Sequence, residues 1–82
     1  MRYYFDMLDS SDLTADEVGL NFVDDNAAIA EGLKSLGDWA SDSTRDFGSR
    51  SVMVCIRNRS REVARLRLRL EIEITPPPVG TR

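Results

Sequence analysis

The segment from Val63 to Ile74 (VARLRLRLEIEI), in which apolar and charged residues alternate strictly from Ala64 on, constrains the fold of this 82-residue chain more than any other feature. Apolar side chains occupy every even position from 64 to 74, and arginine or glutamate occupies every odd position from 65 to 73. Successive side chains of a β-strand point to opposite faces, whereas a helix does not separate residues with this period. The segment therefore predicts a long strand of an antiparallel sheet that is covered on one side only.

The rest of the chain contains the other elements of a small two-layer fold. Alternating apolar residues predict strands over 2–8, 17–23 and 52–56, and a helix is expected from Asp24, as its N-cap, to about Ser41, followed by a loop over 41–51. Gly32 falls on the apolar face of that helix, which would allow a close approach to the sheet, and Gly19 suggests a bulge or a close backbone contact. The prediction is an α+β fold of order β-β-α-β-β, with a four-stranded antiparallel sheet and one helix packed on one face.

One core and one domain are expected. The domain should cover 1–75, and 76–82 should form a flexible tail, because the three successive prolines cannot donate hydrogen bonds to a sheet. Val23 is expected to pack against Ala28 at the start of the helix. The predicted core consists of the apolar residues on the inner faces of the strands and helix: Tyr3, Phe5, Val18, Leu20, Phe22, Ile29, Leu33, Leu36, Trp39, Val54, Ile56, Leu66, Leu68, Leu70 and Ile72.

The predicted last strand is longer than the helix that should cover it. About 12 residues of strand extend ~40 Å, whereas about 17 residues of helix extend ~26 Å. Either the sheet curls or a second copy of the chain covers the exposed end. We therefore expect self-association through Leu70, Ile72 and Ile74.

Composition excludes several kinds of chemistry. The chain has no histidine and a single cysteine, so it contains neither a Ser-His-Asp or Cys-His pair nor a histidine-ligated metal site. Cys55 is expected to be a structural thiol, because no histidine is present to activate it. No apolar run is long enough to span a membrane. We expect a cytoplasmic protein that is not an enzyme, holds no cofactor or metal and does not enter a membrane.

Charge is divided unevenly along the chain. Residues 1–42 contain ten acidic and two basic side chains, a net charge of −8, whereas residues 43–82 contain nine basic and four acidic side chains, a net charge of +5. Such a division fits either an anionic ligand or a fold in which one half neutralises the other, for example through pairing of Asp6 with an arginine. Residues suited to contact phosphates or stack on bases are Arg57, Arg59, Arg61, Arg65, Arg67, Arg69 and Tyr4.

The segments RYYFDM (2–7) and DEVGLNFVDDNAAIAEGLKSLGDWA (16–40) resemble a family of small uncharacterised bacterial proteins. Its members open with Arg-Tyr-Tyr/Phe-Phe-Asp and continue with Asp-x-x-Gly-x-x-x-x-Asp and an Ala/Glu-rich helix. The resemblance covers about residues 1–74, implies the same order of elements, and implies no activity. The matching residues are Arg2, Tyr3, Tyr4, Phe5, Asp6, Asp16, Gly19, Asp24, Ala27, Ala28, Ala30 and Glu31.

Two functions follow as expectations. The first is a non-catalytic interaction module that binds itself or another protein. The alternative is an RNA- or DNA-binding regulator that uses the arginine-rich sheet face, since the order of elements is also similar to that of antitoxins of the HicB type. Against the alternative, the chain carries a net charge of −3, and Glu71 and Glu73 continue the arginine stripe.

Overall fold

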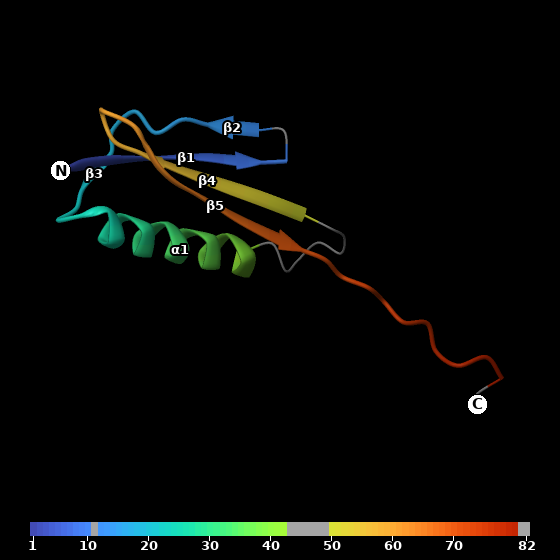
Figure 1. Ribbon diagram of the computed structural model, residues 1–82. Coiled ribbons are helices and arrows are strands. Elements are labelled where there is room, and N and C mark those ends of the chain that lie inside the picture. The colour runs from blue at the N-terminus through green and yellow to red at the C-terminus, as the bar shows by residue number, and fades with distance from the viewer. Residues whose placement is uncertain (11, 43–49, 81–82) are drawn as a thin grey trace.

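The computed structural model describes residues 1–10, 12–42 and 50–80. Its antiparallel sheet has the strand order β2-β1-β4-β5, and β3 pairs with β1 beside β2. Helix α1 lies along one face of this sheet, and the residues after β5 lead away from it (Figure 1). The predicted α+β architecture is confirmed. The elements are β1 (Arg2–Asp9), β2 (Asp12–Thr14), β3 (Leu20–Asn21), α1 (Asp25–Asp42), β4 (Arg50–Arg57) and β5 (Glu62–Leu70).

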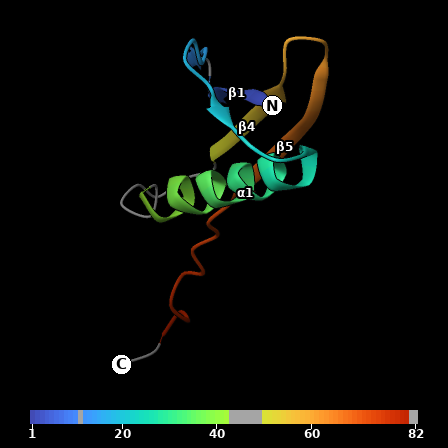
Figure 2. The same cartoon turned by 90° about the vertical axis from the view of Figure 1, so that its left-hand side faces the viewer.

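The core lies between α1 and the central strands. Helix α1 contacts β4 and β5, and Figure 2 shows it running beneath them. Trp39 closes the core near the end of α1, and its indole N–H donates to Asp9 Oδ2 at 3.0 Å. The buried apolar residues are Tyr3, Ala28, Leu36, Trp39, Val52, Val54 and Ile56. Half-buried residues that pack against them include Phe5, Phe22, Ile29, Leu66, Leu68 and Leu70, as predicted.

The predicted second strand over 17–23 forms only at Leu20–Asn21. The chain pairs with β1 at Asp12–Thr14 and again at Leu20–Asn21, and the residues between these pairs leave the ladder. Val18 lies in the part that leaves the ladder and is exposed, and Leu20 is exposed at the edge of the sheet. Neither residue belongs to the core.

The ends of the helix follow the sequence closely. The backbone N–H of Ala27 donates to Asp24 Oδ1 at 2.8 Å, which confirms Asp24 as the N-cap. The predicted packing of Val23 on Ala28 is wrong, because Val23 is 88% exposed. Leu33 was also expected in the core but is exposed, since only one side of α1 faces the sheet. The predicted loop lies largely in 43–49, outside the described residues.

The predicted last strand is too long. β5 ends at Leu70, which pairs with Arg50, the first residue of β4. Residues 71–74 extend beyond that partner and belong to no strand. Ile72, predicted to be in the core, is 36% exposed, and Ile74 is 70% exposed. The position at which β4 begins therefore decides where β5 ends, although the alternating pattern continues.

Gly32 provides a test of the helix–sheet contact. A Cβ atom at Gly32 would lie 2.7 Å from Leu66 Cδ1 and 2.9 Å from Ile56 Cδ1, whereas a Cβ at Gly37 would meet nothing within 4 Å. Gly37→Ala should raise the free energy of unfolding by about 1 kcal/mol, because alanine favours the helix. Gly32→Ala has the same gain but displaces core side chains, which costs about 1–3 kcal/mol. Urea unfolding should give a lower free energy of unfolding for Gly32→Ala than for Gly37→Ala. The reverse order would contradict the close contact between α1 and the sheet.

Candidate interaction surface

A cluster around Asp16 holds the segment that leaves the ladder between β2 and β3. The Asp16 carboxylate accepts hydrogen bonds from the backbone N–H groups of Phe5 at 3.1 Å, Val18 at 3.0 Å and Gly19 at 2.9 Å. The backbone N–H of Asp16 donates to Asp6 Oδ1 at 2.9 Å. These bonds replace the backbone ladder where the chain departs from β1.

Arg57 joins this cluster from β4. Its Nε donates to Asp6 Oδ2 at 2.8 Å, and its Nη2 donates to the carbonyl of Asp16 at 3.0 Å. The hydrogen bond from Arg57 holds the pKa of Asp6 below its usual value. The same guanidinium lies 4.7 Å from the centre of the Tyr4 ring. Arg57 and Tyr4, both predicted to contact a ligand, are therefore engaged with each other and with the first hairpin.

Gly19 and Arg2 complete the same region. Gly19 has φ of +76°, and a Cβ there would lie 2.8 Å from the carbonyl oxygen of Tyr3, so the predicted close approach is confirmed. Arg2 Nη1 donates to the carbonyls of Val18 at 3.1 Å and Gly19 at 3.3 Å. Arg2, Asp6, Asp16 and Gly19 all carry the resemblance noted above. The motif thus describes how the first hairpin is built.

The other predicted arginines divide into paired and unpaired groups. Arg61 pairs with Asp25 at 2.7 Å, Arg65 with Glu62 at 2.6 Å, and Arg69 with Glu71 at 2.7 Å. In the part of the chain that the structure describes, Arg59 and Arg67 have no carboxylate within 4.0 Å. The pairs with Asp6 and Asp25 show that the basic half of the chain neutralises part of the acidic half. The six predicted arginines do not form one cationic patch.

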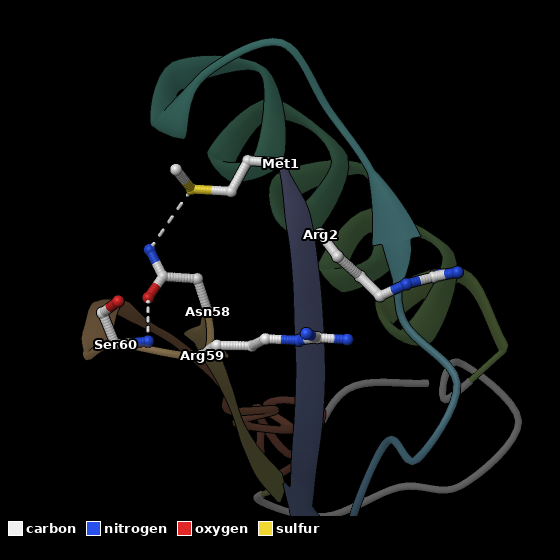
Figure 3. Close-up of a pocket in the computed structure, with 5 residues that line it drawn as sticks. All are labelled: Met1, Arg2, Asn58, Arg59 and Ser60. Carbon is white, nitrogen blue, oxygen red and sulfur yellow. Dashed lines mark hydrogen bonds between the residues drawn. The ribbon is translucent and has the colours of Figure 1, made fainter.

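Arg59 lines a shallow hollow at the start of the chain. The hollow has a volume of about 290 Å³ and is lined by Met1, Arg2, Asn58, Arg59 and Ser60 (Figure 3). Asn58 bridges its two sides, because its side chain accepts from the N–H of Ser60 at 2.8 Å and donates to Met1 Sδ at 3.6 Å. Arg2 donates hydrogen bonds to backbone carbonyls. The guanidinium of Arg59, the other arginine of this hollow, has no hydrogen-bond acceptor among the described residues.

The sheet face opposite α1 contains a second hollow. It has a volume of about 390 Å³, and its lining includes Leu8 and Met53 together with Arg67 and Arg69. Cross-strand pairing places Leu8 opposite Met53 and Met53 opposite Arg67. The hollow therefore combines an apolar contact between Leu8 and Met53 with arginine at the β5 side of the sheet.

Cys55 lies on the same face and is predicted to react slowly. Burial, together with the hydrogen bond that its thiol donates to Glu62 Oε1 at 2.8 Å, raises the pKa of Cys55 to about 11. A raised pKa means less thiolate at a given pH. At pH 8 a disulfide reagent should react roughly 10- to 100-fold more slowly with the native protein than with the urea-unfolded protein. Equal rates would contradict this environment.

Among the described residues, the outer edge of β5 is the longest strand edge without a partner strand. β5 is the outermost strand on its side, and alternate residues among its nine present backbone N–H and C=O groups outward. Leu66, Leu68 and Leu70 remain half-buried on the helix side, and Ile72 and Ile74 follow them in the exposed segment. Leu70, Ile72 and Ile74, the predicted self-association residues, therefore lie at and just beyond the end of this edge.

Sequence reasoning missed the role of Asp16. The acidic side chains of residues 9–17 fit a solvated loop, whereas Asp16 accepts from three backbone N–H groups and its own N–H donates to Asp6. The sequence signal for this role is Asp16 followed three residues later by Gly19, a spacing at which an aspartate carboxylate can accept hydrogen bonds from the backbone of the turn that follows it.

The described residues contain no group of three or more acidic or cysteine side chains placed to hold a metal ion. None of their helices is long and apolar enough to cross a membrane.

Comparison with known proteins identifies one family. The family model described as "Domain of unknown function (DUF6894)" matches residues 2–69. This range contains every described strand except the last residue of β5, and it ends before the exposed isoleucines. Neither the curated proteins nor the solved structures contain a significant match.

Proposed function

We propose that this chain, which belongs to the DUF6894 family of domains of unknown function, is a non-catalytic interaction module that binds a second copy of itself through the free edge of β5. The main observation behind this proposal is that the alternation of apolar and charged residues continues to Ile74, although β4 pairs with β5 only as far as Leu70. A segment with this pattern is suited to a sheet, and the described part of the chain supplies no strand to pair with it.

The chemistry of the edge supports this proposal. Backbone groups along an outer strand can add a strand from another chain, and alternate apolar side chains then pack against each other. Burying an exposed isoleucine contributes about 1.5–3 kcal/mol, so covering Ile72 and Ile74 would favour association. Arginine and glutamate on the other face keep the edge soluble and restrict which strands can pair with it.

The remaining groups support a role without catalysis. The carboxylates of Asp6 and Asp16 are occupied by Arg57 and by backbone N–H groups. The thiol of Cys55 is held protonated. Nucleic-acid binding stays a prediction, and it would depend on Arg59 and Arg67, because the other predicted arginines are paired.

Lysine substitutions beyond β5 test the proposed association. Ile72→Lys with Ile74→Lys changes residues outside any strand, so the fold should remain intact while the charge prevents their burial. In sedimentation equilibrium the wild-type protein should approach twice its mass of 9.2 kDa as the concentration rises, and the double variant should remain at 9.2 kDa.

Val79→Lys is the matched control, since Val79 is fully exposed in the tail, and it should associate like the wild type. A wild-type protein that stays at 9.2 kDa at every concentration would refute the proposal. Equal association of the double variant would also refute it.

A further inference from the structure

We infer that two copies pair antiparallel along residues 66–74, with the twofold axis at Leu70, so that Arg67 faces Glu73 and Arg69 faces Glu71 of the second copy. This inference rests on the proposed function and specifies its geometry. It is carried by the charge sequence of the free edge and by the point at which β4 begins, opposite Leu70.

Symmetry limits the possible pairings. A twofold dimer that joins the same edge of both copies must pair the strand with its own reverse, so residues equally distant from the axis face each other. Directly opposite residues of antiparallel strands point to the same face of the sheet. The charged residues of one copy therefore meet the charged residues of the other, and the apolar residues meet apolar residues.

The charges select one of these pairings. With the axis at Leu70, each arginine at 67 and 69 faces a glutamate, and no like charges are opposed. An axis at Arg69 would place that arginine opposite itself, and an axis at Glu71 would do the same for that glutamate. An axis at Leu68 would place Arg67 opposite Arg69. Like charges directly opposite each other destabilise a sheet, whereas opposite charges stabilise it.

The apolar face agrees with the same axis. Leu70 meets Leu70 of the second copy, Leu68 meets Ile72, and Leu66 meets Ile74, so half-buried leucines cover the exposed isoleucines. Residues 71–74, which β4 does not reach, would lie beside residues 66–69 of the second copy. Pro76 would fall opposite Ala64, and because proline cannot donate to a ladder, the paired region ends there.

Reversed charges test this pairing. One variant carries Arg67→Glu and Arg69→Glu, and the other carries Glu71→Arg and Glu73→Arg. All four side chains are exposed, so each variant should fold like the wild type. Each variant alone opposes like charges, and its self-association should be at least about tenfold weaker than that of the wild type. An equimolar mixture restores every opposite pair and should form a heterodimer at least as tight as the wild-type dimer.

The outcomes separate the register from the proposed function. If the wild type associates but both variants associate equally well and mixing adds nothing, the register is overturned while association through β5 stands. If the wild type does not associate, both the register and the proposed function fall. Loss of association in each variant, with recovery only in the mixture, would support opposite charges facing each other across the β5 edge, as the axis at Leu70 requires.

Discussion

Replacing Asp16 with alanine is expected to lower the free energy of unfolding by about 2–4 kcal/mol, because it removes the acceptor of three backbone N–H groups. The Phe5 N–H is the most affected, since it belongs to the central part of β1, where neither β2 nor β3 pairs with it. Urea unfolding measures this loss. Glu17→Ala is the matched control: it removes the same charge one residue later from an exposed side chain and should change stability by less than about 0.5 kcal/mol.

The effect of Asp16 should also depend on pH. Burial raises the pKa of Asp16, but the hydrogen bonds from Gly19, Phe5 and Val18 outweigh it and leave the pKa below its usual value of 3.8. A depressed pKa in the folded state contributes stability above 3.8 that is lost as the pH falls through the folded value. The difference between wild type and Asp16→Ala should therefore shrink in strong acid. A constant difference, or equal effects of Asp16→Ala and Glu17→Ala, would contradict the assigned role.

Replacing Ile56 with alanine is expected to cost about 2–5 kcal/mol, the largest loss predicted for the apolar core. Ile56 is 0% exposed, lies near the end of β4 and contacts α1 at Gly32. The cavity left by the substitution cannot be filled by the backbone of α1, because the helix already lies close to the sheet. Thermal or urea unfolding at low protein concentration measures the loss.

Ile74→Ala provides the matched control for Ile56. The chemical change is identical, but Ile74 is 70% exposed and lies outside every strand. At a concentration at which the protein is a monomer, its effect on stability should be within about 0.5 kcal/mol of zero. Similar losses for both variants would mean that the position of the core is wrong.

Local patterns predicted the elements whose sequences carry a clear period. The alternation in β4 and β5, the N-cap at Asp24 and the close approach at Gly32 follow from neighbouring residues and agree with the structure. The end of β5 does not follow from neighbouring residues, because it depends on where β4 begins along the chain. The same limitation applies to Val18, whose strand-like pattern is overruled by the bonds that Asp16 makes to the backbone.

The candidate surface was only partly predictable for a related reason. Sequence spacing placed Arg65, Arg67 and Arg69 on one face, which the register of β5 confirms. It did not reveal which arginines are paired, since Arg57 and Arg61 meet Asp6 and Asp25 from distant parts of the chain. The overhang was predicted from length alone. The exposure of Ile74 agrees with it, but residues 71–74 belong to no strand, and Ile72 lies outside the core in which it was also predicted.

Hydrogen exchange of the backbone amides of residues 71–74, measured as a function of protein concentration, tests the proposed pairing most directly. These residues belong to no strand within one copy. If a second copy pairs here, the amides of residues 71–74 that point toward it should exchange quickly in dilute solution. They should become protected as the protein concentration rises. If all of them exchange at the unprotected rate at every concentration, while the amides of β4 stay protected, the edge does not bind a second copy and the central proposal is wrong.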